Sequence, residues 1–177
     1  MALTEKEKDF LKKLARDTIK ARLFKKKFEK QDIPETLKQH QGAFVTIKKK
    51  GELRGCIGYL KGYLPLHETV EQMAVQAAFH DPRFDAISKE EFKDLEIEIS
   101  VLSPLKKIEN IEEIQVGVHG IFIEKGFYSG LLLPQVATEY GWDRKTFLEH
   151  TCYKAGLHKD AYKEKDTHIY IFSAEVF

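Results

Sequence analysis

The stretch ELRGCIGYL, residues 52–60, brings together a thiol, a guanidinium and two glycines within a few positions. If it forms a strand, side chains two residues apart lie on one face, so Arg54 and Cys56 project side by side. A nearby guanidinium favours the thiolate, which is the nucleophilic form of cysteine. The pattern fits a thiol nucleophile at Cys56, and it also fits a small buried residue at a tight backbone crossing.

A second group of polar residues lies in HDPRF, residues 80–84. Asp81 before Pro82 predicts a turn, and turns often carry functional side chains. His80, Asp81 and Arg83 are therefore candidate binding residues. A helix cap and a surface ion pair would explain the same residues without any ligand.

Further polar side chains could complete a catalytic group around Cys56. Glu98 and Ser100 lie on the polar face of the strand predicted by LEIEISVLS, and His119 lies between glycines in GVHG. Cys56, His119 and one carboxylate could serve as nucleophile, base and orienting group. The candidate residues are, for catalysis, Cys56, Arg54, His119 and Glu98, and for binding, Asp81, Arg83, Ser100 and His80.

Metal and cofactor motifs are missing from the sequence, although it holds seven histidines and two cysteines. It contains no H-E-x-x-H and no C-x-x-C, two spacings typical of zinc sites. It also lacks G-x-x-x-x-G-K-[ST] and G-x-G-x-x-G, which bind phosphate groups. We therefore predict no metal site and no cofactor.

The charge balance argues against a general affinity for nucleic acid. Lysine plus arginine (29) nearly equals aspartate plus glutamate (28). Tyr140, Trp142 and Tyr153 stand near lysines, a combination that could stack on bases. Ordinary core and surface packing explains these aromatic residues as well. The sequence therefore gives no strong nucleic-acid signal.

The sequence also predicts a cytoplasmic protein without a membrane span. Its longest apolar runs, such as GLLLP near residue 132, fall far short of the roughly 20 residues needed to cross a bilayer. MALTEKEKDF has no apolar signal-peptide core. The two cysteines form no disulfide framework, so both are expected to be reduced thiols. Cys152 is expected in a helical core, because it lies at helical spacing from Phe147 and Leu148.

Hydrophobic spacing predicts the elements that position these residues. Thr4 with Glu7 forms a capping box for a helix over about 4–27. AFVTIKKKGELRGCI predicts a hairpin that turns at KKKG. LPLHETVEQMAVQAAF predicts a helix, and KEEFKDL, which follows a second capping box, predicts another.

The second half of the chain repeats this plan. Each half reads strand, strand, helix, helix, strand, over about residues 42–105 and 117–177. Gly55 has a counterpart in Gly130, so we expect this glycine to serve the architecture. Two units are too few for a solenoid.

We therefore predict a single α+β domain over residues 1–177. Its two pseudo-repeated units would form one curved, barrel-like, mainly antiparallel sheet, with an added N-terminal helix. Arg54 and Cys56 match Ser129 and Leu131 in the second unit. Their chemistry therefore belongs to one half only.

Six stretches, in order along the chain, resemble the AMMECR-one family, whose bacterial and archaeal members are labelled AmmeMemoRadiSam system protein A. LRGCIG is the characteristic motif of that family. The resemblance implies an α+β fold of two similar units, each with three strands and two helices. The stretches are LRGCIG (53–58), DPRF (81–84), EISVLSP (98–104), GVHG (117–120), GLLLPQVATEYGWD (130–143) and TCYKAGL (151–157).

The resemblance implies partners but no reaction, because the family has no established biochemical activity. The system label associates it with a Memo-type protein, similar to extradiol dioxygenases, and with a radical S-adenosylmethionine (SAM) enzyme. This chain lacks the clustered cysteines of an iron–sulfur cluster, so it would be the third component.

Three functions remain open at the level of sequence. The first is an enzyme or enzyme subunit with a pocket around LRGCIG for an unknown small molecule. The second is a non-catalytic module in which Arg54 and Arg83 bind an anionic small molecule or a protein partner. The third is a structural adaptor. We favour the first, because an inward-facing arginine without a partner would cost roughly 1–3 kcal/mol.

Overall fold

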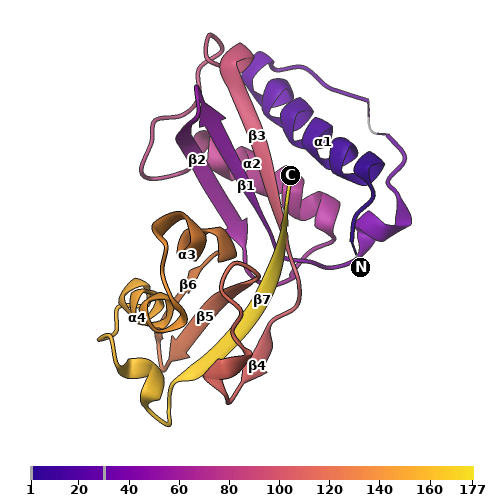
Figure 1. The fold of residues 1–177 in the computed structure, drawn as a ribbon. Coiled ribbons are helices and arrows are strands. Elements are labelled where there is room, and N and C mark those ends of the chain that lie inside the picture. The colour runs from indigo at the N-terminus through magenta and orange to yellow at the C-terminus, as the bar shows by residue number, and fades with distance from the viewer. Residues whose placement is uncertain (1, 30) are drawn as a thin grey trace. The chain divides into compact units, whose positions relative to one another are not determined.

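The computed structural model describes residues 2–29 and 31–177. The chain forms two compact units (Figure 1). The first runs up to Leu102 and includes Glu175–Phe177, and the second is Ser103–Ala174. Each unit combines antiparallel strands with α-helices, which confirms the predicted α+β class.

Helix α1, Glu5–Phe24, begins at the predicted capping box. The Thr4 hydroxyl accepts from the Glu7 N–H, and the Glu7 carboxylate accepts from the Thr4 N–H. The helix ends earlier than predicted because Lys25 takes the left-handed conformation, with φ of 51°. Its buried stripe consists of Leu11, Leu14, Ala15 and Ile19.

Three antiparallel strands form the sheet of the first unit. They are β1 Ala43–Lys49, β2 Glu52–Tyr59 and β3 Leu95–Leu102, in the order β2-β1-β3. β1 pairs with both neighbours, and β2 lies at one edge. Toward the other edge, Ile99 of β3 exchanges backbone hydrogen bonds of 2.9 and 3.1 Å with Phe177.

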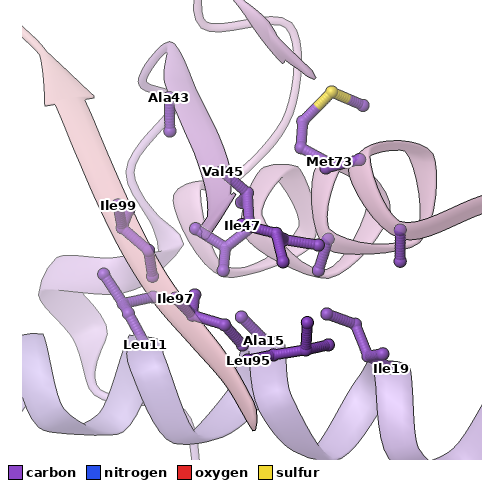
Figure 2. Close-up of a cluster of buried hydrophobic side chains, with 14 of the residues drawn as sticks. Leu11, Ala15, Ile19, Ala43, Val45, Ile47, Met73, Leu95, Ile97 and Ile99 are labelled. Atoms are coloured by element: carbon purple, nitrogen blue, oxygen red, sulfur yellow. The ribbon is translucent and has the colours of Figure 1, made fainter. Parts of the chain in front are cut away.

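One face of this sheet packs against α1 and α2, Leu66–Phe79 (Figure 2). Alternate residues of β1 and β3 enter the core, as the two-residue period of a strand requires. Thr46 and Glu98 lie between these core residues and therefore face away from the core. The core residues on the two strands are Ala43, Val45, Ile47, Leu95, Ile97, Ile99 and Val101.

The prediction of a helix over KEEFKDL is wrong. Ser88 and Glu91 form the predicted reciprocal hydrogen bonds, at 2.9 and 3.3 Å. Only a 3-10 turn, η2 Phe92–Asp94, follows before the chain enters β3. The Glu91 carboxylate also binds Arg54, so the capping box anchors a loop instead of starting an α-helix.

β2 contains a β-bulge at Arg54. Ile47 pairs with Gly55 and Lys48 pairs with Leu53, so Arg54 is the extra residue. A bulge re-aims the side chains beside it and increases the local twist. The alternation of side chains between the two faces of β2 therefore breaks at Arg54, which was expected to project beside the Cys56 thiol.

The described residues of the second unit form four antiparallel strands and two α-helices. The strands are β4 Lys106–Ile108, β5 His119–Lys125, β6 Tyr128–Leu132 and β7 His168–Val176, and the helices are α3 Pro134–Tyr140 and α4 Arg144–Lys154. β7 pairs with β4 and β5, and β5 pairs with β6. Because the chain reaches β3 at the end of β7, the strand order is β2-β1-β3-β7-β5-β6. The predicted mainly antiparallel sheet is confirmed.

Cys152 lies in the hydrophobic core of the second unit, as predicted from its helical spacing. It is fully buried, together with Phe147 and Leu148 of the same helix. Burial raises the pKa of its thiol, because the thiolate loses hydration there. Cys152 is therefore a packing residue.

The predicted counterparts Gly55 and Gly130 have the same architectural role. A Cβ on Gly55 would lie 2.1 Å from the carbonyl oxygen of Ala77 in α2. A Cβ on Gly130 would lie 2.5 Å from the backbone nitrogen of Ala155, directly after α4. Each glycine therefore lets its strand approach a helix more closely than a side chain would permit.

The predicted match between Arg54 and Ser129 is wrong. Ser129 pairs with Glu124 in a hairpin that has no bulge, so it takes the place of Leu53. Arg54 has no counterpart in β6 for this reason. The difference between the two hairpins is therefore an inserted residue as well as a change of side chain.

Candidate functional site

Cys56 lies in β2 directly opposite Thr46 of β1. Its backbone N–H donates to Asp81 Oδ2 at 3.0 Å, and its carbonyl accepts from Arg83 Nη2 at 3.3 Å. An edge strand exposes backbone groups that have no strand partner, and these two side chains satisfy them. The main chain at Cys56 is therefore fixed through both of its polar groups.

Asp81 is the buried centre of these contacts, with a side chain only 1% exposed. Arg83 binds it through two parallel hydrogen bonds, Nε to Oδ1 at 3.0 Å and Nη2 to Oδ2 at 2.8 Å. The Arg83 guanidinium, helped by the backbone N–H of Cys56, holds the pKa of Asp81 well below its usual range, although burial acts in the opposite direction. Asp81 is therefore a structural anion at neutral pH.

Arg54 makes a second set of bonds from the bulge of β2. Its Nε and Nη2 donate to the two carboxylate oxygens of Glu91, at 3.0 and 3.3 Å. Its Nη1 donates to the Asp85 carbonyl at 2.7 Å. Arg54, followed by the backbone N–H of Ser88, lowers the pKa of Glu91 to about 2. The guanidinium is thus bound to the loop and its carboxylate.

These two sets of bonds hold one loop against one strand. We call the side chains of Arg54, Asp81, Arg83 and Glu91 the clamp; it ties residues 81–91 to β2. Within the clamp, Arg54 donates its hydrogen bonds to Glu91 and to backbone carbonyls of the loop. The sequence expectation that Arg54 would act on the Cys56 thiol therefore has no support in these contacts.

Arg83 is the cation bound to the main chain of Cys56, because its Nη2 donates to the Cys56 carbonyl. The hydrogen bond to Asp81 raises the pKa of Arg83. Its side chain is 55% exposed, so part of the guanidinium remains accessible to a ligand. A residue predicted for binding thus lies beside the main chain of Cys56 with part of its guanidinium exposed.

The thiol of Cys56 is half-buried and lies on the sheet face opposite the core. Its Sγ lies 3.2 Å from Thr46 Oγ1, which is hydrogen-bonding distance for sulfur. Thr46 also pairs directly with Glu98 of β3. Cys56, Thr46 and Glu98 therefore form a row across three strands on one face.

Glu98 and Ser100 have different surroundings on β3. Glu98 Oε2 accepts from Lys48 Nζ at 3.1 Å, so its ion-pair partner is a lysine. Ser100 is 1% exposed and pairs with Phe44 in β1. The row beside the thiol therefore includes Glu98, whereas Ser100 is buried two residues further along β3.

Comparison with known proteins places this geometry in a family. The AMMECR1 family model matches residues 12–177. The chain belongs to the AMMECR1 family. It is 46% identical over 153 residues to a protein of Methanothermobacter thermautotrophicus, covering 82% of this chain and 79% of that one. It is 44% identical over 185 residues to a protein of Methanopyrus kandleri, covering 99% and 89%.

A crystal structure of a protein called uncharacterised, from Pyrococcus horikoshii, has the same fold. Its TM-score is 0.91 at 41% identity, covering 98% of this chain and 92% of that one. Two of the stretches that carry the AMMECR1 resemblance, LRGCIG and DPRF, touch each other in the clamp. LRGCIG is thus part of a structural unit as well as the place of the thiol.

The two candidate histidines lie outside these contacts. His80 is exposed and ends α2, with its N–H donating to the Gln76 carbonyl. His119 belongs to the second unit, where its Nδ1 accepts from the Gln115 N–H at 3.1 Å. Their predicted roles in this AMMECR1 protein stay predictions.

Sequence reasoning missed Thr46 and Glu91 as parts of the site. The sequence holds a signal for Glu91, because it completes the Ser88 capping box. Thr46 becomes visible only through the strand register, which the bulge at Arg54 determines. No spacing rule within a single strand would have found it.

No cluster of three or more His, Cys, Asp or Glu residues suited to a metal ion occurs in residues 2–29 and 31–177. Over the same residues, no helix has the length and apolar character of a membrane span.

Proposed function

We propose that this AMMECR1 protein is an enzyme, or the subunit of an enzyme, whose reactive group is the Cys56 thiol. The observation that carries the proposal is the thiol's fixed and accessible position. The main chain of Cys56 is held by Asp81 and Arg83, while its side chain is half-buried on the face away from the core. A nucleophile needs this combination of fixed position and access.

The substrate class we propose is a small molecule with a carboxylate or phosphate group. Arg83 supports this choice, because its guanidinium is partly exposed and lies within 3.3 Å of the Cys56 carbonyl. A guanidinium forms charge-assisted hydrogen bonds with such anions, and Nη1 is the Arg83 nitrogen that is not bound to Asp81 or Cys56. Arg83 would orient the anion while the thiol meets the electrophilic centre.

The alternative is a non-catalytic binding or adaptor module for an anionic small molecule or a protein partner. The clamp favours this alternative, because its hydrogen bonds join β2 to the loop. Arg54 binds Glu91 and the Asp85 carbonyl, and Asp81 binds the Cys56 N–H. In that case Cys56 would be a small residue beside an anion site, and its reactivity would be ordinary.

We further propose that the protein is cytoplasmic and works with Memo-type and radical SAM proteins. The proposal of these partners rests on the resemblance of LRGCIG and the other five stretches to the family whose members carry the AmmeMemoRadiSam system label. Two reduced thiols suit such a compartment.

Two alkylating reagents of similar size test the substrate class. Iodoacetate carries a carboxylate and iodoacetamide does not, so Arg83 should favour iodoacetate at Cys56. We expect the iodoacetate-to-iodoacetamide rate ratio at Cys56 to exceed that of glutathione by roughly threefold or more, as a nearby cation implies. Mass spectrometry of the Cys56 peptide gives both rates.

The matched variants are Arg83→Gln and Arg144→Gln. Arg83→Gln should return the rate ratio to that of glutathione. Arg144 binds Glu112 in the second unit, so Arg144→Gln should leave the wild-type ratio unchanged. A ratio equal to that of glutathione in the wild-type protein would remove Arg83 as the anion-binding residue.

A further inference from the structure

Helices α1 and α2 pack side by side in the first unit, and both line one small cavity. On α1 the lining residues Phe10, Leu14 and Asp17 are four and three positions apart, so they share one face of the helix. On α2 the lining residues His67 and Glu71 are four positions apart and share a face in the same way. Each helix therefore gives the cavity one wall.

The least exposed side chains of the cavity are apolar. Leu14 is buried, and Phe10, Phe28 and Ile33 are half-buried. Exposed polar side chains line the cavity as well, so it opens to solvent. Its volume is about 120 Å³. An apolar cavity of about 150 Å³ in an engineered protein holds benzene, so the space here suits one ring or a short branched chain.

The charged side chains of the cavity are mainly acidic. Three carboxylates line it, those of Asp17, Glu29 and Glu71, together with one lysine, Lys13. Lys13 forms an ion pair with Asp17. Glu71 is half-buried and has no ion-pair partner among residues 2–29 and 31–177. The described residues therefore give the cavity an excess of negative charge, and Glu71 is the carboxylate that lacks a cation.

A second polar group on the same wall also lacks a partner. The Nδ1 atom of His67 is buried and forms no hydrogen bond within the described part of the chain. His67 lies one turn before Glu71 on α2. A neutral histidine ring accepts a hydrogen bond at Nδ1 when its hydrogen is on Nε2. Leaving such an atom unpaired costs free energy, and a group supplied from outside the chain is one explanation for it.

We propose that this cavity binds a small organic amine. Its apolar body would lie against Phe10 and Leu14, and its ammonium would lie beside Glu71 and His67. An ammonium has several N–H donors and no acceptor, so it can bond to a carboxylate and to a ring nitrogen at once. An anion would meet the carboxylates of the cavity, and a neutral apolar molecule would leave Glu71 without a cation. An amine with an apolar body therefore suits the cavity better than either.

Nuclear magnetic resonance (NMR) titration of the full chain with benzylamine tests this proposal. Benzyl alcohol has the same ring without the charge, and methylamine has the charge without the ring. We expect saturable shifts of the Leu14 and Ile33 amides at millimolar benzylamine. Benzyl alcohol should bind about fivefold more weakly, because its bond to the carboxylate is not between charged groups. Methylamine should give no saturable shift, because it buries little apolar surface.

Matched substitutions on α2 separate the cavity carboxylate from general electrostatics. Glu71→Gln keeps the size of the side chain and removes its charge. It should weaken benzylamine binding about fivefold and change benzyl alcohol binding less than about twofold. Glu68→Gln removes the same charge from an exposed position on the same helix outside the cavity. It should change both affinities less than about twofold.

The proposal is overturned if benzylamine gives no saturable shift at the Leu14 and Ile33 amides. Equal binding of benzyl alcohol would mean an apolar cavity that does not recognise amines, and saturable binding of methylamine would mean an acidic surface without an apolar part. Wild-type affinity in Glu71→Gln would also contradict it. No residue that lines the cavity belongs to β2 or to the clamp, so this inference and the proposed function at Cys56 fail separately.

Discussion

Asp81 and Glu91 are the two acidic residues that hold the loop beside the thiol. Both are carboxylates whose main partners are arginines, and both have pKa values below the usual range. Asp81 is almost fully buried, whereas Glu91 is partly exposed. Because one binds the backbone of Cys56 and the other binds Arg54, the loop depends on two ionised groups.

The depressed pKa values predict how stability depends on pH. A carboxylate with a lower pKa in the folded state stabilises the fold above its unfolded pKa and loses that contribution as pH falls. For Glu91 the window runs from 4.5 down to about 2. We expect Glu91→Gln to lower the free energy of unfolding at pH 7 by about 1–3 kcal/mol, because Arg54 loses its ionic partner.

Urea unfolding at several pH values measures this effect. The difference between wild type and Glu91→Gln should shrink between pH 4.5 and about 2, because wild-type Glu91 becomes protonated there. Asp85→Asn is the control, since Asp85 is exposed and meets Arg54 through its backbone carbonyl. A difference that stays constant down to pH 2 would show that Glu91 is not the ionised partner.

At the scale of elements, the bulge in β2 separates the role of Arg54 from that of Cys56. It directs Arg54 toward the loop, while Cys56 keeps its place opposite Thr46. The hairpin of β5 and β6 has no bulge, so β6 has no residue at the position of Arg54. The bulge therefore supplies one of the two sets of bonds that join LRGCIG to the loop.

The loss of the Arg54 guanidinium should release the loop locally. We expect Arg54→Met, which keeps a long side chain but no donors, to speed amide exchange in residues 85–91 about tenfold or more. Amides of α1 should keep their rates. Hydrogen exchange read by mass spectrometry measures both segments in one experiment.

Arg22→Met is the matched control, because Arg22 lies at the exposed end of α1. If Arg54→Met leaves residues 85–91 as protected as in wild type, the clamp does not depend on the bulge. If α1 loosens as well, the effect is global and the local interpretation fails.

The sequence predicts the elements well where periodicity is strong. The capping box of α1, the first hairpin and β3 all follow from it. Gly55 is predicted as architectural, and its close approach to Ala77 agrees. These features depend on local spacing, which one sequence contains.

The sequence misplaces the site where tertiary contacts override spacing. Arg54 is expected beside the thiol, but the bulge turns it toward Glu91, and Arg83 is the cation that binds the main chain of Cys56. The predicted helix after Ser88 fails because Glu91 binds β2. Contacts between residues far apart in sequence decide both cases, and no local pattern encodes them.

At the scale of the whole molecule, the two units give the two cysteines opposite environments. Cys152 fills the core of the second unit and is fully buried. Cys56 lies on the outer face of the first, with a hydroxyl and a partly exposed guanidinium near it. The buried Cys152 thiol is thus an internal control for the reactivity of Cys56, because both are measured in the same protein under the same conditions.

The rate at which native Cys56 reacts with iodoacetamide at pH 7 tests the central claim most directly. We predict that Cys56 reacts faster than glutathione under the same conditions, and that Cys152 reacts only after unfolding, as their environments require. Cys56→Ser should abolish the native reaction, and Cys152→Ser should leave it unchanged. A native Cys56 that reacts no faster than glutathione would contradict the thiol nucleophile and favour the binding module.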